Sequence, residues 1–406
     1  MGARLAPCHT SVHDTVYNYS SPVPGMVCKG RGALSNSEGR FESRRITAVD
    51  DGWYRDERPG NGPATVARPE RARSIITRNR SPDVPFDRSI NPYRGCEHGC
   101  VYCFARPSHA YLNLSPGLDF ETRLFYKENA AEVLERTLSR RGYRCAPVVL
   151  GTNTDPYQPL DRRLMLTRQL LEVLYRFRHP VSIITKGSHV QRDLDLLGAM
   201  ASENLASVCI SITTLDDTLK RSLEPRAASP RRRLDAVAAL SAAGVPVSVL
   251  AAPIIPAIND AELESIMARA AEAGARSAAY VLLRLPHEVA GLFREWLQAH
   301  YPERAEHVMS LIRQCRDGRT YDACFGKRMR GTGPFAELLA RRFELACRRH
   351  GLDRRNHDEL DTGHFRIPAR IDPGSQMSLW CTAASVFRAA ITAPRRKAMV
   401  PSRRAR

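Results

Sequence analysis

From about residue 86 onward, short apolar runs alternate with amphipathic stretches of helical length. Apolar runs of four to eight residues are typical of buried strands, and apolar positions three and four apart are typical of helices that cover a core. The strand-like runs are 89–93, 148–152, 181–185, 207–213, 245–251 and 279–285. The helical stretches between them are 128–140, 164–177, 192–202, 230–243 and 261–273.

Six strand–helix repeats predict an α/β protein with a parallel sheet and right-handed crossovers. Such a sheet is either open or closed into a barrel, and in both cases ligands gather at the carboxyl ends of the strands. After residue 286 the strand pattern ends, and three further helices are expected over 288–299, 302–316 and 334–350. We therefore divide this part of the chain into a core over 86–286, a helical C-terminal cap over 287–350, and a loose polar segment and basic tail over 351–406.

Residues 1–85 are rich in Gly, Pro, Ser and Arg and show no sustained period. We expect an irregular N-terminal extension, in which the Gly-punctuated piece 29–41 wraps over the surface. Gly30 and Gly32 do not form a phosphate-binding loop, because no strand precedes them and no Gly-Lys-Ser/Thr follows.

The composition argues against a membrane protein, a secreted protein and a disulfide-stabilised protein. The sequence has 406 residues, no run of 18 apolar residues, and no apolar region of secretory length near residue 1. A cytoplasmic protein without a membrane span is therefore expected. Eleven cysteines in a chain of this length do not indicate a disulfide framework, and clustered cysteines in a reducing compartment more often bind metal or act in catalysis.

The net charge of +18 has two interpretations. A basic protein can bind nucleic acid through counterion release, or it can simply present a solvated basic surface. Part of the charge is local, because residues 381–406 hold seven Lys and Arg and no acid. For this tail disorder is the favoured interpretation, whereas for the rest of the chain both interpretations stay open.

Three cysteines follow the first predicted strand with the spacing C-x3-C-x2-C: Cys96, Cys100 and Cys103. Three thiolates without a fourth nearby can hold an iron–sulfur cluster that keeps one iron open. Gly95 and Gly99 allow the backbone to curl around such a cluster. The alternative is a zinc site completed by His98 or by a distant ligand, although zinc ribbons usually pair two C-x2-C knuckles and no second knuckle exists here.

The cysteine spacing, with Tyr102 just before the last cysteine, resembles the signature of radical S-adenosylmethionine (SAM) enzymes. The surrounding Asn-Pro-Tyr-Arg-Gly-Cys-x-His-Gly-Cys-x-Tyr-Cys resembles the subgroup related to spore photoproduct lyase, whose members are often labelled DNA repair photolyases. The likeness covers roughly 86–290, and the flanking segments 1–85 and 286–380 are typical of an uncharacterised branch.

The resemblance implies a partial (β/α)6 TIM-like barrel of parallel strands. It also implies a 4Fe–4S cluster on Cys96, Cys100 and Cys103, with SAM bound to the open iron and Tyr102 beside it. One electron from a reductant such as flavodoxin or ferredoxin then cleaves SAM to a 5′-deoxyadenosyl radical, which abstracts hydrogen from a substrate. Such chemistry needs a shielded site that excludes water.

Residues at the strand ends are candidate SAM contacts. The resemblance places a Ser/Thr-Asp pair after the second strand, which Thr154 and Asp155 match, and Asp155 could accept hydrogen bonds from a ribose. The alternative is that this segment only forms a turn, because Asp-Pro is common in turns. Lys186 follows the third strand, where the resemblance implies contact with the SAM carboxylate, and an exposed loop lysine is the alternative.

The fourth predicted strand alternates in character. Cys209, Ser211 and Thr213 share one face, and a polar face belongs inside a ligand-filled barrel. Ser211 and Thr213 are therefore SAM-site candidates. Cys209 is a candidate catalytic residue, although a buried free cysteine usually only packs.

Glu224 and Arg226 follow the fourth strand. They could bridge cluster, SAM and substrate, because arginine suits a carboxylate or a phosphate. A surface ion pair between them is the alternative.

One position departs from the related lyase, which uses a cysteine at the end of its second strand as hydrogen donor. Thr152 stands there in this sequence, and a hydroxyl holds its hydrogen too tightly for that role. Cys145 lies before the strand, at the wrong end. We therefore expect a hydrogen abstraction other than the thymine-dimer reaction.

Two hypotheses follow. The leading one is a radical SAM enzyme whose substrate, judged from the basic charge, is nucleic acid. The alternative is a nucleic-acid-binding protein with a structural zinc or iron–sulfur site. A further motif, Gln-Met-Ser-Leu-Trp at 376–380, resembles peptides that bind the replication sliding clamp.

Overall fold

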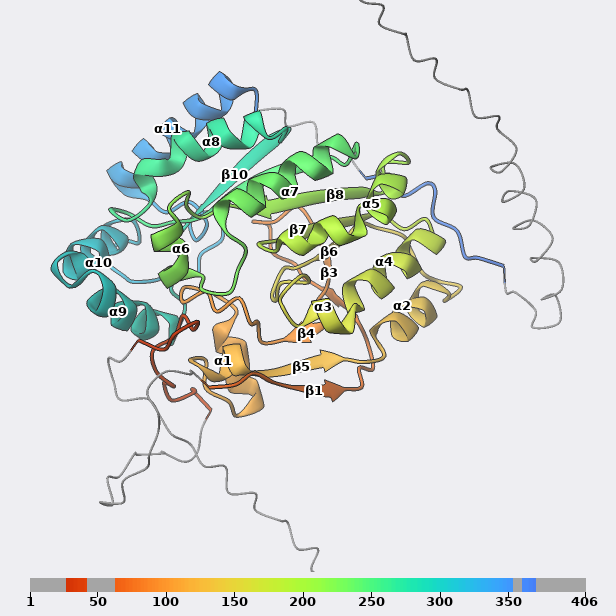
Figure 1. The fold of residues 1–406 in the computed structure, drawn as a ribbon, viewed down its shortest axis with the longest axis horizontal. Coiled ribbons are helices and arrows are strands. Elements are labelled where there is room, and N and C mark those ends of the chain that lie inside the picture. The colour runs from red at the N-terminus through yellow and green to blue at the C-terminus, as the bar shows by residue number, and fades with distance from the viewer. Residues whose placement is uncertain (1–26, 42–62, 353–359, 370–406) are drawn as a thin grey trace, which may run out of the picture. The chain divides into compact units, whose positions relative to one another are not determined.

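A seven-stranded sheet with the order β10-β9-β8-β7-β6-β3-β2 forms the centre of the fold (Figure 1). The computed structural model describes residues 27–41, 63–352 and 360–369. Six neighbouring strands run parallel: β3 (Arg88–Ile90), β6 (Val148–Leu150), β7 (Val181–Thr185), β8 (Ala206–Ser211), β9 (Val247–Ile254) and β10 (Ser277–Leu282). The predicted α/β fold with six parallel strands is confirmed. The short strand β2 (Ile76–Arg78) pairs antiparallel with β3 at the edge.

Helices that follow the strands cover the sheet (Figure 1). They are α2 (Ala130–Leu138), α4 (Leu166–Arg176), α5 (Leu194–Ala201), α7 (Pro230–Ala242) and α8 (Leu263–Glu272). Helix α7 shows why these stretches are helical. Its N-cap Ser229 accepts from the backbone N–H of Arg232, Pro230 follows at the first position, and Gly244 adopts a positive φ of 79° just after its end.

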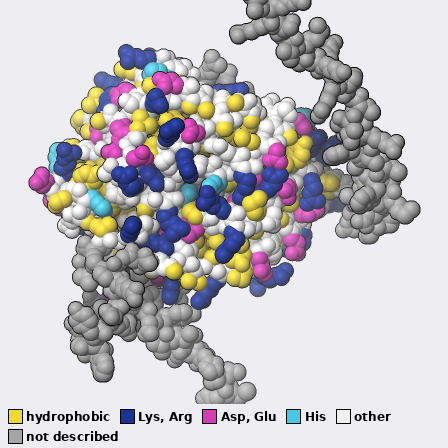
Figure 2. Space-filling view, viewed as in Figure 1, with side chains coloured by type: hydrophobic (Ala, Val, Ile, Leu, Met, Phe, Trp, Pro, Cys, Tyr) yellow, Lys and Arg dark blue, Asp and Glu magenta, His cyan; other side chains and the backbone are white. Residues whose placement is uncertain are grey.

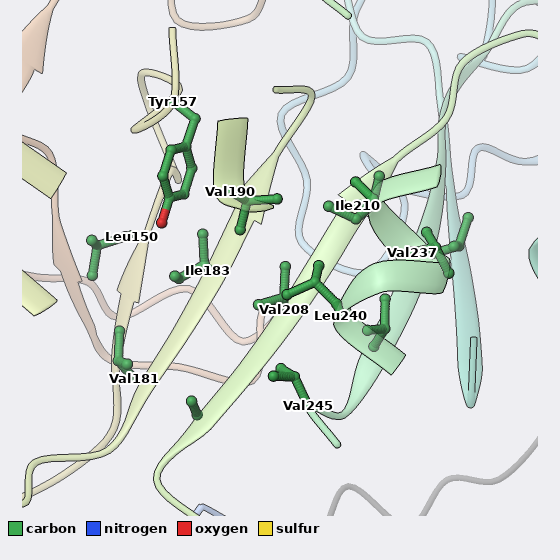
Figure 3. Packing of buried hydrophobic residues seen from close by; sticks show 14 of the residues in the cluster. Leu150, Tyr157, Val181, Ile183, Val190, Val208, Ile210, Val237, Leu240 and Val245 are labelled. Atoms are coloured by element: carbon green, nitrogen blue, oxygen red, sulfur yellow. The ribbon is translucent and has the colours of Figure 1, made fainter. Parts of the chain in front are cut away.

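The main core lies between the sheet and these helices. Figure 3 shows Val208 and Ile210 of β8 beside Val237 and Leu240 of α7, and all four side chains are buried. Each such side chain contributes about 1.5–3 kcal/mol through the apolar area removed from water. The apolar face predicted for the fourth strand therefore packs under a helix, which leaves the opposite face of β8 for the interior of the partial barrel.

A second, three-stranded sheet lies beside the first, with the order β1-β5-β4. Its strands are β1 (Val66–Glu70), β5 (Arg123–Lys127) and β4 (Tyr93–Arg94). Strands β1 and β2 fall within the stretch that we expected to be irregular. Both are short edge strands, and β1 contains Pro69, which is tolerated at an edge but masks the strand pattern.

The C-terminal part of the described chain is helical, as predicted. It contains α9 (Val289–His300), α10 (Ala305–Gln314) and α11 (Gly333–His350), and α11 packs against α8. The smaller elements are α1 (Asp119–Thr122), α3 (Asp161–Leu164), α6 (Asp217–Leu223) and the 3-10 turns η1 (Arg106–Leu112), η2 (Ser188–Asp193), η3 (Asp260–Glu262) and η4 (Pro302–Arg304). None of the described helices is both long enough and apolar enough to cross a membrane. The motif at 376–380 and the basic tail lie outside the described residues.

Candidate active site

The three cysteines of the predicted cluster site lie on one loop that follows β4 near the carboxyl end of β3. Two backbone hydrogen bonds anchor this loop: Cys96 N donates to Phe120 O at 2.9 Å, and Val101 N donates to Leu223 O at 3.1 Å. All three cysteines are free thiols, with Cys96 and Cys100 buried and Cys103 half-buried. The loop is thus held from two sides, by α1 and by the end of α6.

Glycines shape the cysteine loop. Gly95 and Gly99 have φ angles of 77° and 67°, a left-handed conformation that other residues adopt at a cost. A Cβ on Gly99 would lie 2.7 Å from a carboxylate oxygen of Glu121, and a Cβ on Gly32 would overlap the carbonyl oxygen of Gly99. The backbone of the N-terminal segment 27–41 therefore lies directly against the cysteine loop.

A buried ion pair holds that segment in place. Arg106 Nη2 lies 2.5 Å from Glu121 Oε1, and Arg106 Nε donates to Cys100 O at 2.9 Å. Glu121 also accepts from the backbone N–H groups of Gly32 (3.0 Å) and Ala33 (2.8 Å). Ala33 and Leu34 are buried, so the expected surface wrap over 29–41 is instead partly internal. The sequence of this segment did not predict its burial, because Glu121, which accepts from its backbone N–H groups, lies almost 90 residues away.

Burial keeps the three thiols protonated in the absence of a metal. Burial raises the pKa of Cys96, and the neighbouring Asp155 carboxylate and Cys100 thiol raise it further. Burial likewise raises the pKa of Cys100 and of Cys103. Thiols in such a position lose their protons when a metal cation takes the protons' place.

Two further observations bear on the kind of metal site. The backbone N–H of Asp155 donates to the Cys96 sulfur, a contact that stabilises a thiolate bound to iron. Across the described ranges, no three His, Cys, Asp or Glu side chains converge on one shared metal ion. Thiols that bind three separate irons of a cluster do not need that convergence.

Four predicted SAM-site residues come together beside the cysteine loop. The Tyr102 hydroxyl donates to Glu224 Oε1 and lies 3.3 Å from Thr213 Oγ1. Lys186 Nζ donates to Thr213 Oγ1 at 3.1 Å and lies 3.2 Å from Glu224 Oε1. The Lys186 ammonium also lies 5.7 Å from the centre of the Tyr102 ring. Strand-end positions far apart in sequence thus form one polar cluster.

Arg233 completes this cluster and was missed in the sequence. It donates from Nη2 to Glu224 Oε2 and from Nη1 to the backbone oxygen of Ser211, the latter at 3.0 Å. Burial raises the pKa of the Glu224 carboxyl, but Arg233 and Lys186 lower it by more, so that Glu224 is ionised. Arg233 lies in a basic run at the start of α7, where the sequence pattern predicts a solvent-facing side chain.

Thr154 and Asp155 bond to protein groups in this structure. Asp155 accepts from the Thr185 hydroxyl at 2.6 Å and from Lys186 N at 2.7 Å, and its Oδ2 lies 3.3 Å from Nδ1 of His98. The Thr154 hydroxyl donates to Tyr93 O at 3.1 Å. Asp155 therefore joins the loop after β6 to β7 and to the cysteine loop, as the turn alternative expects. Its predicted contact with a ribose stays a prediction.

Arg226 does not pair with Glu224. Its guanidinium lies 3.1 Å from Glu97 on the cysteine loop, and its backbone N–H donates to His98 O at 3.2 Å. The alternative of a surface ion pair between these two residues is therefore wrong, because Lys186 and Arg233 already enclose the buried Glu224, whereas their predicted contacts with SAM or substrate stay predictions. Arg226 instead braces the cysteine loop from a half-exposed position.

The remaining candidates lie on β8 and after β6. Burial raises the pKa of the Cys209 thiol, whose sulfur accepts a hydrogen bond from Ser248 on the neighbouring strand. Cys209 is thus mid-strand, two residues before β8 ends at Ser211. The Thr152 hydroxyl accepts from Asn91 Nδ2 at 3.2 Å, so that it faces the loop that leads to the cysteines.

A cavity of about 240 Å³ opens next to the cysteine loop. Phe104, the residue after Cys103, lines it with Arg284 and Tyr321. The Arg284 guanidinium lies 5.2 Å from the Phe104 ring centre and 5.9 Å from that of Tyr321, and its Nε is buried without a hydrogen-bond partner. Two aromatic rings and a cation therefore line a cavity beside the cysteine loop.

Known proteins resemble this chain in sequence and in fold. The sequence profile described as "Radical SAM superfamily" matches residues 90–270. An uncharacterised protein of Mycobacterium bovis is 38% identical over 233 residues, which cover 57% of this chain and 68% of that protein. A protein of Pseudomonas phage M6 named radical SAM Nalpha-GlyT isomerase is 23% identical and covers 66% of this chain and 51% of its own length.

Among solved structures, spore photoproduct lyase complexed with dinucleoside spore photoproduct superposes with a TM-score of 0.50. The two sequences are 16% identical, and the match covers 70% of this chain and 79% of the lyase chain. At this identity the likeness concerns the fold alone.

Proposed function

The chain belongs to the radical SAM superfamily and is an enzyme of that class, and we propose that Cys96, Cys100 and Cys103 hold its cluster and that its substrate is a nucleic acid. Members of the superfamily use a 4Fe–4S cluster and SAM. When both are bound, they supply a 5′-deoxyadenosyl radical that abstracts hydrogen. The observation that supports the ligand assignment is the set of three free thiols, two of them buried, on one loop beside the polar cluster of Tyr102, Lys186, Thr213, Glu224 and Arg233.

The chain's own residues can orient SAM and exclude water. Lys186 reaches this polar cluster on a flexible stem, and its ammonium can bind a carboxylate. Glu224 can accept from an ammonium, while Arg233 keeps it ionised and fixed. Around these groups, Val101, Leu223 and Ile255 belong to a buried apolar cluster that also contains Cys100. This apolar shell keeps water and stray hydrogen donors away from the reacting atoms.

The substrate proposal rests on the cavity beside the cysteine loop. Phe104 is 47% exposed and Tyr111 is 71% exposed, and both line the cavity that Arg284 also lines. Exposed aromatic rings provide stacking surfaces for bases, and arginine binds phosphate through paired N–H groups. Figure 2 shows Lys and Arg scattered over the visible face with Asp and Glu between them, so the net charge alone does not locate the substrate.

The chain differs from the lyase at the hydrogen-donor position. Thr152 carries a hydroxyl where the resemblance places a thiol, and Cys209 is packed in the middle of β8. We therefore propose a hydrogen abstraction on nucleic acid that does not depend on a thiol at the end of β6.

The test measures whether nucleic acid stimulates SAM cleavage. The reconstituted protein is incubated anaerobically with SAM and dithionite, with and without single-stranded DNA or RNA, and 5′-deoxyadenosine is quantified. We expect stimulation in the wild type, a weaker effect in Arg284→Gln, and a normal effect in Arg294→Gln, which removes an exposed charge on α9. No stimulation by either polymer would reject the substrate proposal. Stoichiometric zinc without iron in anaerobically purified protein would instead favour the structural zinc alternative.

A further inference from the structure

A second cavity, of about 620 Å³, lies at the other end of the sheet from the cysteine loop. Its walls come from the segment before β2, from the first residue of β3, from the end of α2 and from the loop before β6. Its volume is within the range of pockets that hold small ligands. None of the residues discussed for SAM or substrate lines it.

Arginines dominate the lining of this cavity. They are Arg73, Arg78, Arg88, Arg140 and Arg144. The described residues that line the cavity include no Asp or Glu. Four of these arginines are exposed, and within the described ranges their guanidinium groups have no hydrogen bond or ion pair. Four guanidinium groups without an acidic partner make the cavity positive, which favours an anionic ligand.

Arg88 distinguishes this cavity from a merely basic surface. Its side chain is only 8% exposed, and its Nε has no hydrogen-bond partner and lies 3.6 Å from the mostly exposed Asp87 carboxylate. Its Nη1 donates to Arg144 O at 2.5 Å and to the Tyr143 hydroxyl at 3.3 Å. A buried cation with such weak compensation is costly, and a bound anion would offset that cost.

Tyr143 is held as a fixed wall of the cavity. Its hydroxyl lies 2.8 Å from His179 Nε2, while His179 Nδ1 donates to Pro180 O at 2.9 Å. This leaves Nε2 to accept from Tyr143, and the Tyr143 oxygen to accept from Arg88. Ile75 and Ile76 add apolar surface to the same cavity. The lining therefore combines a positive region with an apolar and aromatic wall.

From these features we infer that the cavity is a binding site for a phosphate-bearing ligand of nucleotide size. Guanidinium groups match phosphate oxygens in paired hydrogen bonds, and the apolar wall suits the body of such a ligand. Its phosphate could belong to a free nucleotide or to the end of a nucleic-acid strand. This site is independent of the proposed reaction and of the substrate proposed for it.

Isothermal titration calorimetry on the full chain tests this site with three probes: ATP, inorganic pyrophosphate and a 5′-phosphorylated oligonucleotide. We expect the wild type to bind ATP and the double variant Arg140→Gln, Arg144→Gln to bind it about tenfold more weakly or worse. The matched control is Arg341→Gln, Arg349→Gln, which removes two exposed arginines from α11 and should bind like the wild type.

Each further outcome decides the question. Tighter binding of the oligonucleotide, with displacement of ATP, supports the site and identifies a strand end as the source of the phosphate. Failure of all three probes to bind overturns the site, as does an equal loss of affinity in both double variants. Displacement of ATP by excess SAM also overturns it, because ATP would then occupy the SAM position.

Discussion

The ammonium of Lys186 lies 3.2 Å from Oε1 of Glu224, a fully buried carboxylate whose other oxygen accepts from Arg233. Two cations thus enclose one anion beside the cysteine loop. The three side chains together carry one net positive charge. This charge suits a site that receives the carboxylate of an amino acid. The same arrangement makes Glu224 important for stability as well as for binding.

Replacing Glu224 with Gln should destabilise the protein by about 3–5 kcal/mol, because the buried Arg233 and the partly buried Lys186 would lose their counter-charge. Chemical denaturation of the wild type and the variant measures this loss. Glu132→Gln is the matched control, since Glu132 forms an exposed pair with Arg136 on α2 and should change stability by less than about 0.5 kcal/mol. Equal effects of the two substitutions would contradict the buried network.

Replacing Gly32 with Ala should weaken cluster binding, although Gly32 is more than 60 residues before Cys96, the first cysteine of the loop. The added methyl group would overlap Gly99 O and push the 27–41 segment away from the cysteine loop, at a cost of about 1–3 kcal/mol. Iron content and the visible absorbance of the reconstituted protein measure the effect. Gly142→Ala should have none, because a Cβ there meets nothing within 4 Å. Full iron loading of the Gly32 variant would show that this contact is dispensable.

The pH dependence of stability should carry a contribution from His179. Burial lowers its pKa from 6.5 to about 4, so between these values the unfolded chain binds a proton that the folded protein does not. Stability should therefore fall by ~2 kcal/mol between pH 7 and pH 5 through this residue, with little further change below pH 4. Chemical denaturation of the wild type and of His179→Gln at pH 7 and pH 5 measures this contribution as the difference between their changes in stability. An unchanged difference in the variant would show that His179 titrates normally.

The parallel core could be predicted because strands buried on both faces appear as apolar runs, and each run was followed by an amphipathic helix. The convergence of Tyr102, Lys186, Thr213 and Glu224 could be anticipated from the rule that ligands gather at the carboxyl ends of such strands. Ser211 belongs to the same region through its backbone oxygen.

Arg233 and the pair of Arg106 with Glu121 could not be found in this way. A charged residue in a helical stretch predicts a solvent-facing side chain, and only the tertiary fold reveals the partner that makes burial possible. Strands β1 and β2 were not predicted for a related reason. Their pairing residues are distant in sequence or lie across a loop, so local periodicity carried no signal.

The most direct test of the central claim is the formation of 5′-deoxyadenosine by the anaerobically reconstituted protein with SAM and dithionite. We expect the wild type and Cys324→Ala, which alters an exposed cysteine outside the loop, to form the product at similar rates. Cys100→Ala should form none above background and should lose the iron–sulfur absorbance. Equal product from Cys100→Ala and wild type, or no product from an iron-loaded wild type, would contradict the assignment of the three cysteines.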